Sequence, residues 1–292
     1  MITDEFKGLG PGRECQMAEK KVKVIRPKGS RWELGLGEIW EYRELLYFLV
    51  WKQIKTKYKQ SVLGIGWAII QPLLLTFVFG FIFYGIANLP TDRISPYPFL
   101  FSGLILWTFI STTVTSASLS LISNASMISK VYFPRVLIPL SLVIAGLLDY
   151  AISWTMLVVV IIVGGEMFSA WSVLLWVPLL LAFLLSAGVS FWLSAAAAKY
   201  RDVQYIVPFG VSIAMYASPV LYPISWAFND LTKLALNLNP LTGIFTAQRF
   251  FIFGRPEMDF MPLLYSVFAT LAIFLTGLLY FKHYERQLAD VI

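Results

Sequence analysis

The sequence is poor in the residues that build metal centres, disulfides and proton relays. It holds one cysteine, Cys15, and one histidine, His283, so neither an internal disulfide nor a cysteine–histidine ligand set can form. Charged residues make up 14% of its 292 positions, whereas soluble globular domains carry about 25%. Hydrophobic residues account for 58%. This balance excludes an ordinary soluble domain and predicts an all-α polytopic membrane protein.

The sequence motifs of ATP and metal chemistry are also missing. No GxxxxGK[ST] phosphate-binding loop occurs, and the glycine-rich stretch at residues 8–12 lacks the required lysine. No HExxH or similar metal-ligand spacing is present. We therefore expect no catalytic residue, no metal and no cofactor in this chain. Any ATP-driven step would have to take place on a partner.

Positive charge is concentrated ahead of the first long hydrophobic run. The net charge is +6, and thirteen of the 23 lysines and arginines precede residue 64. This placement is typical of the cytoplasmic side of a membrane protein and of an anionic lipid surface. We therefore expect membrane lipid, and no nucleic acid, as the partner of these cations.

Three regions follow from the hydropathy pattern. Residues 1–30 are predicted to form a polar cytoplasmic tail, residues 31–63 an amphipathic interfacial helix region, and residues 64–292 a transmembrane domain. Lysine and arginine in the loops after spans two and four, and in the C-terminal tail, place both termini in the cytoplasm. The six predicted spans are 64–87, 98–122, 136–163, 171–198, 205–221 and 261–281.

The predicted interfacial helix, residues 38–60, carries rings along one stripe. Trp40, Tyr47 and Trp51 recur at steps of seven and four, and Lys55 lies on another face with further lysines. Rings beside lysines are typical of a helix in the plane of the membrane surface. A core helix of a soluble domain is the alternative.

Residues 222–260, between spans five and six, contain apolar runs that are too short to cross a bilayer. Three prolines, Pro223, Pro240 and Pro256, interrupt them. Because unpaired backbone groups are costly in lipid, this segment is predicted to form re-entrant or interfacial helices. A simple external loop is the alternative.

Two kinds of side chain inside the predicted spans suggest function. Asp149 is the only ionisable residue well inside a span, where it serves either a structural or gating role or contacts cargo. Rings away from the membrane surfaces either pack against lipid and helices or line a channel for a sugar polymer, whose pyranose faces suit them. The candidate lining residues are Phe81, Tyr84, Trp107, Tyr216, Tyr222 and Trp226.

The loop after span two mixes cations with rings. A short helix parallel to the membrane here could dock into a cytosolic partner, and an ordinary basic anchor is the alternative. Its candidate coupling residues are Lys130, Tyr132, Phe133 and Arg135.

Three stretches carry a family resemblance: LLYFLVWKQIKTKYKQSVLGIGWAIIQPLL at 45–74, SKVYFPRVLIPLS at 129–141 and KYRDVQYIVPF at 199–209. They resemble the membrane (permease) subunit of ABC-2 type polysaccharide exporters, which export O-antigen, capsular polysaccharide and teichoic acid. The resemblance implies a homodimer that works with two copies of a separate cytoplasmic ABC ATPase subunit, which binds ATP and Mg. It also implies an entrance framed by the interfacial helix, a coupling loop at 129–135 and an outer gate after Tyr222.

The expected function is the transmembrane subunit of an ATP-driven exporter of a lipid-linked surface polysaccharide, O-antigen among them, in the bacterial cytoplasmic (inner) membrane. One alternative with the same architecture is an ABC-2 exporter of small hydrophobic compounds. Another alternative is a membrane-embedded glycan-processing enzyme, which would need converging carboxylates or a histidine near the membrane interface. A purely structural membrane subunit is a further alternative.

Overall fold

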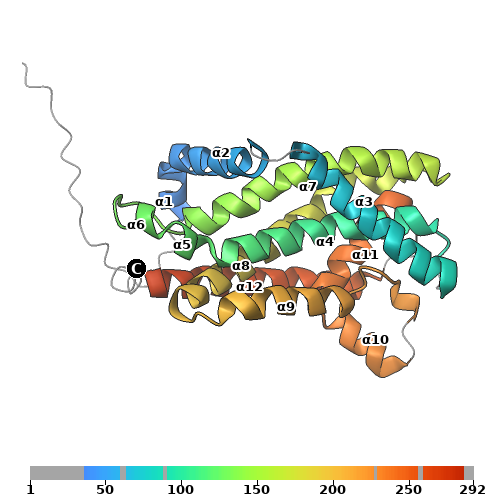
Figure 1. Ribbon diagram of the computed structural model, residues 1–292. Helices are drawn as coiled ribbons and strands as arrows, with labels where there is room; N and C mark the ends of the chain where they lie inside the picture. Colours follow the sequence, from blue (N-terminus) through green and yellow to red (C-terminus); the bar gives the residue numbers. More distant parts are fainter. Residues whose placement is uncertain (1–35, 60–63, 88–90, 227–228, 256–258, 286–292) are drawn as a thin grey trace, which may run out of the picture. The chain divides into compact units, whose positions relative to one another are not determined.

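The computed structural model describes residues 36–59, 64–87, 91–226, 229–255 and 259–285, and within these ranges the chain is helical with no strand (Figure 1). The all-α prediction is therefore confirmed for the described residues. The predicted tail at 1–30 lies outside them. The α-helices are α1 (Leu36–Glu41), α2 (Arg43–Lys59), α3 (Trp67–Phe79), α4 (Pro96–Ser118), α5 (Ser120–Ser123), α6 (Ala125–Ile128), α7 (Leu137–Val163), α8 (Trp176–Lys199), α9 (Val203–Tyr216), α10 (Asp230–Asn237), α11 (Pro240–Phe253) and α12 (Phe260–Glu285). Shorter helical turns are η1 (Gly64–Gly66), the π-helical η2 (Gly80–Ile86), η3 (Ala170–Leu174) and η4 (Ile224–Trp226).

Five helical segments of the described chain are long and apolar enough to cross a membrane, so this is a multi-pass membrane protein. They overlap predicted spans one to four and six. The segments are Gly64–Ile86, Pro96–Ser118, Leu137–Val163, Ala170–Lys199 and Phe260–Glu285.

The predicted fifth span differs from the structure. Its helix, α9, ends at Tyr216 after 14 residues, which is about 21 Å of helix against about 30 Å of hydrocarbon. Pro219 supplies a physical reason, because it has no N–H and disfavours the helical conformation of the residue before it. The count of six spanning helices is therefore not confirmed.

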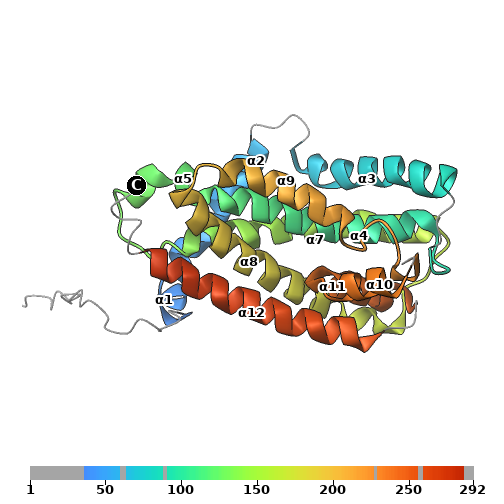
Figure 2. The ribbon, with the colours of Figure 1, turned by 90° about the horizontal axis from the view of Figure 1, so that it is seen from below.

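Helix α4 lies at the centre of the packing (Figures 1 and 2). It contacts α3, α7, α8, α9 and α11. In its most apolar 18-residue window 72% of the residues are buried, whereas the other four candidate spans bury only 17–39%. Fewer than half of the residues in these other windows are therefore fully buried within the described chain.

Helices α8 and α12 approach each other through glycines. A Cβ atom on Gly277 would lie 2.3 Å from the carbonyl oxygen of Gly188, and one on Gly188 would lie 2.6 Å from Cα of Phe274. Small residues allow such close backbone approach between helices in lipid, where packing rather than the hydrophobic effect drives association. Beyond the glycines, the rings of Trp192 and Tyr280 stack at 4.1 Å.

The predicted helix over residues 38–60 is divided at Tyr42 into α1 and α2. Helix α2 packs against α7 and buries Leu49. Its position at a membrane surface stays a prediction.

The segment after α9 is helical rather than a simple loop. It contains η4, α10 and α11, and α11 packs against α4, α8 and α12. Most of the side chains of α11 are buried. The segment therefore extends into the core of the helix bundle.

Candidate functional site

A non-helical stretch, residues 217–222, follows α9, and side chains supply most of its hydrogen bonds. Five of the six backbone carbonyls at 216–221 accept a hydrogen bond from a side chain, with donor–acceptor distances of 2.6–3.2 Å. The sixth, that of Ser218, accepts from the backbone N–H of Val220. The side-chain pairs are Tyr222 Oη to Tyr216, Asn239 Nδ2 to Ala217, Arg249 Nη1 to Pro219, Arg249 Nη2 to Val220 and Tyr84 Oη to Leu221.

Arg249 of α11 provides two of these bonds from inside the bundle. The residue is 2% exposed, and its guanidinium carbon lies 3.7 Å from the centroid of the Phe99 ring. The guanidinium group keeps its charge at neutral pH, so its burial is tolerated only with hydrogen bonds and an aromatic face around it. Arg249 is not among the candidate residues predicted from the sequence. A lone arginine inside the apolar run FTAQRFFIF was the signal that could have found it.

The site also requires a glycine on α4. A Cβ atom on Gly103 would lie 2.7 Å from the carbonyl oxygen of Val220 and 2.8 Å from Nη2 of Arg249. Any larger residue at 103 would therefore displace either the non-helical stretch or the guanidinium group.

Four of the predicted lining rings gather at this stretch. Tyr84 is half-buried, with its ring edge-on to Phe99, and the half-buried ring of Tyr222 lies 5.7 Å from that of Trp226. Burial raises the pKa of Tyr222 above its ordinary value, so its hydroxyl stays protonated and donates to the Tyr216 carbonyl. The Tyr216 side chain itself is exposed.

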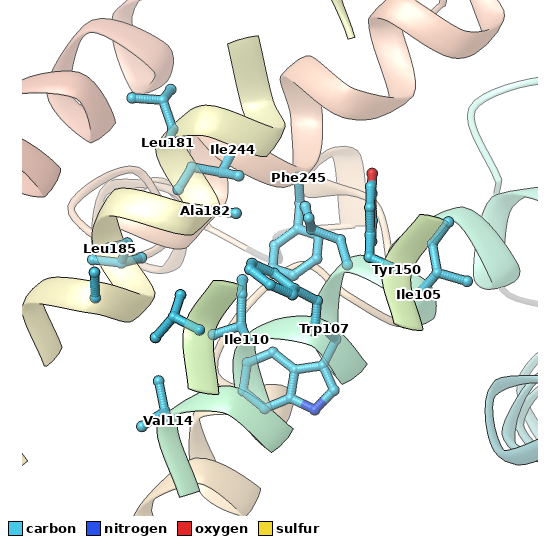
Figure 3. Close-up of a cluster of buried hydrophobic side chains, with 14 of the residues drawn as sticks. Ile105, Trp107, Ile110, Val114, Tyr150, Leu181, Ala182, Leu185, Ile244 and Phe245 are labelled. Carbon is cyan, nitrogen blue, oxygen red and sulfur yellow. The ribbon is translucent and has the colours of Figure 1, made fainter. Parts of the chain in front are cut away.

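The other two predicted lining rings lie elsewhere. Phe81 is exposed on η2. Trp107 is 6% exposed and lies in the buried cluster formed by α4, α7, α8 and α11 (Figure 3). Its indole ring packs in the core of the described chain, so Trp107 is not included in the proposed channel lining.

Asp149 of α7 is engaged by helix α2. Lys57 Nζ and Tyr58 Oη each donate to one of its carboxylate oxygens. Nearby, Lys52 Nζ donates to Asn124 Oδ1 at 3.2 Å. A cavity of about 400 Å³ lies between α2, α4, α5 and α7, and Asp149 is part of its lining. Because both carboxylate oxygens have partners from α2, the structure favours the structural role of Asp149.

The predicted interfacial residues lie on the exposed side of α1 and α2. Trp40, Tyr47, Trp51 and Lys55 are all exposed. An open groove of about 420 Å³ follows α2 and combines rings with three lysines. Its lining is Phe48, Trp51, Lys52, Lys55, Thr56 and Lys59.

The predicted coupling loop has an anchored part and an exposed part. Phe133 is buried, and the half-buried Arg135 donates its backbone N–H to Glu285 Oε1 at 2.7 Å and its Nη1 to the Glu285 carbonyl at 3.0 Å. Lys130 and Tyr132 are exposed, Tyr132 by 84%. The loop therefore leaves the side chains of Lys130 and Tyr132 exposed, while Arg135 ties it to the end of α12.

A further tie joins three loops at the other end of α7. The Glu166 carboxylate accepts from the backbone N–H of Ser95 at 2.7 Å and from Nη2 of Arg255 at 2.7 Å. These contacts connect the start of α4, the turn after α7 and the turn after α11.

The chain matches a known protein family. The family model of the ABC-2 type transporter matches residues 44–253. The chain belongs to the ABC-2 type transporter family. The resemblance seen in the sequence is thereby confirmed, and the matched region of this ABC-2 transporter extends from α2 to α11, across every contact described at residues 216–222.

Named relatives cover nearly the whole ABC-2 transporter chain. It is similar to the O-antigen export system permease protein RfbA of Myxococcus xanthus, with 27% identity over 258 residues that cover 87% of this chain and 98% of the relative. Two O-antigen export system permease proteins RfbA of Klebsiella pneumoniae are 28% identical over 252 and 254 residues. Each alignment covers 85% of this chain and 95% of the relative.

The contact between α2 and α7 gives a first prediction for this ABC-2 transporter. Asp149→Asn and Lys57→Gln should each lower the thermal unfolding midpoint in detergent, because each breaks the same ion pair. The double variant should be no less stable than the worse single one, with a coupling of about 1 kcal/mol because Lys57 is half exposed.

Lys55→Gln is the matched control, since Lys55 is exposed on the same helix. Its midpoint should stay near that of the wild type. Additive losses for Asp149→Asn and Lys57→Gln would contradict the pairing.

Proposed function

We propose that this chain is the permease subunit of an ATP-driven exporter that moves a lipid-linked surface polysaccharide of the O-antigen class across the bacterial cytoplasmic membrane. The observation that carries the proposal is similarity over 85–87% of the chain to relatives named as O-antigen export permeases. The clustering of Tyr84, Tyr216, Tyr222 and Trp226 supports a glycan as cargo, because rings present flat faces to pyranose C–H groups.

The proposed topology has six crossings, with both termini in the cytoplasm. Residues 203–221 supply the fifth crossing as a 14-residue helix followed by a non-helical stretch. The helix alone spans about 21 Å of the hydrocarbon thickness of about 30 Å, and residues 217–221 continue the chain beyond it. Side-chain donors to the carbonyls at 216–221 make non-helical backbone tolerable at that depth.

In the proposed assembly, two copies of the chain enclose a channel and two copies of an ABC ATPase subunit bind ATP and Mg on the cytoplasmic side. Lys130 and Tyr132 face the ATPase. Phe133 and Arg135 pass its motion to the bundle, because Arg135 is bonded to the end of α12 through Glu285.

Helices α1 and α2 lie at the cytoplasmic membrane surface in this proposal, with Trp40, Tyr47, Trp51 and Lys55 toward lipid headgroups. Helices α10 and α11 form the interfacial or re-entrant pair at the outer side. Phe81, Tyr84, Tyr216, Tyr222 and Trp226 face the channel, where weak ring contacts let a polymer slide.

Deleting the gene should abolish surface display of the polysaccharide and leave full-length, lipid-linked polymer inside the cell, because synthesis does not depend on an export subunit. Fractionation with a glycan immunoblot measures both, and complementation should restore display. Polymer that is never made would indicate a processing enzyme. Normal surface display would contradict a glycan as the cargo and favour an exporter of small hydrophobic compounds.

Tyr132→Ala should weaken co-purification of the ATPase and reduce export several-fold while the protein level stays normal, because this side chain is exposed and contributes little to folding. Phe133→Ala is the matched comparison. It removes a buried ring, which costs about 3–5 kcal/mol, so the protein level itself should fall. Normal ATPase binding by the Tyr132 variant would remove this loop from the contact.

Tyr216→Ala and Trp226→Ala should slow export of the polymer without loss of assembly with the ATPase, because each removes a ring from the proposed lining. Pulse-labelled polymer reaching the surface measures the rate. Phe268→Ala on α12 is the control, since it removes an exposed ring from another helix. Wild-type rates in both test variants would exclude these rings from the lining.

A further inference from the structure

Helix α11 is held in the bundle by contacts that do not involve Arg249. Gln248 Nε2 donates to the Ser102 carbonyl of α4 at 2.6 Å, and the Gly243 N–H donates to Ser266 Oγ of α12 at 3.1 Å. A Cβ atom on Gly243 would lie 2.3 Å from the Pro262 carbonyl oxygen, so α11 and α12 are in close backbone contact. Arg249 therefore projects from a rigid support.

Residues 217–222 have no such support from a helical ladder. Their carbonyls depend on side chains from two separate elements: Tyr84 of η2, and Asn239 and Arg249 at the start of and within α11. Two of the bonds come from the one guanidinium group, which is planar and presents its donors as a fork. Because both bonds share that group, a movement of Pro219 and Val220 away from it breaks them together.

The rings of the proposed lining lie on both sides of this stretch. Tyr216 precedes it, Tyr222 ends it, and Trp226 contacts the Tyr222 ring. Their positions therefore depend on the course of the backbone between them. Ser218, Pro219, Val220 and Leu221 are all buried, so the stretch is packed against its support.

We propose that Arg249 is a positioning residue for export: its guanidinium group latches the non-helical stretch 217–222 to α11, and this latch sets whether the outer end of the channel is closed. The inference rests on the proposed export function. With both bonds made, the stretch stays buried and the rings keep their places. When the bonds break, the stretch leaves its support and the rings move with it, a hinge-like switch between two discrete arrangements.

The test measures how often the stretch opens, independently of cargo. Cys15→Ser removes the chain's single cysteine, and Ser218→Cys then places one thiol at a fully buried position of the stretch. N-ethylmaleimide labelling in membranes reports its exposure. Arg249→Lys keeps the charge but cannot hold both carbonyls with a planar fork, so labelling should rise at least about tenfold. Surface polymer should fall in the same variant.

Tyr84→Phe is the second variant, and it removes one hydroxyl that donates to Leu221. Labelling should rise in this variant too, but by less than in Arg249→Lys. If the Arg249→Lys protein does not accumulate, the labelling of Tyr84→Phe tests the latch in its place. Arg255→Lys is the control, because this exposed arginine pairs with Glu166 instead and lysine can keep that pair. Its labelling should equal that of the parent.

Equal labelling in the parent, Arg249→Lys and Tyr84→Phe would overturn the latch. So would an equal rise in Arg255→Lys, which would indicate general loosening. If the predicted labelling occurs in a protein whose deletion leaves surface polysaccharide unchanged, the latch stands as a structural device and the export function fails. The two inferences are thereby tested separately.

Discussion

A backbone carbonyl away from water must find a donor, and this requirement governs the structure around residues 216–221. Where α9 stops, the helical ladder that would supply donors stops with it. Arg249, Asn239 and Tyr84 replace it from other parts of the chain, and Tyr222 from the end of the stretch itself. The buried helix α11 carries Arg249 to these carbonyls, and Gly103 leaves the space in which they meet.

Charged groups join distant parts of the chain at other places too. Asp149 of α7 meets Lys57 of α2, and Glu166 meets Arg255 and the backbone of Ser95. At the predicted coupling loop, Arg135 meets Glu285. Each tie joins elements that are far apart in the sequence. In the proposed exporter, such links are the contacts through which motion at the predicted coupling loop reaches the rest of the bundle.

Particular residues mark how far the sequence predicts this fold and site. Five long apolar runs correspond to helices of spanning length because length and hydropathy are local properties. The apolar run at 205–221 continues past Pro219, whereas the helix does not, so hydropathy alone places the end of α9 wrongly. Trp107 shows a similar difference, since a ring in an apolar helix has the same pattern whether it faces a channel or the core. Its burial depends on neighbours from α7, α8 and α11.

The sequence by itself determined that the chain is an all-helical membrane protein, that its cations gather at one end, and that ATP chemistry has no motif here. It also carried the family resemblance in three local stretches. Only the tertiary structure decided which groups meet. The residues that meet are 29–150 positions apart in the sequence. Asp149 pairs with Lys57, Glu285 anchors Arg135, and Arg249 binds the carbonyls of Pro219 and Val220. Contacts over such separations depend on how helices pack, and packing is not a property of any local stretch.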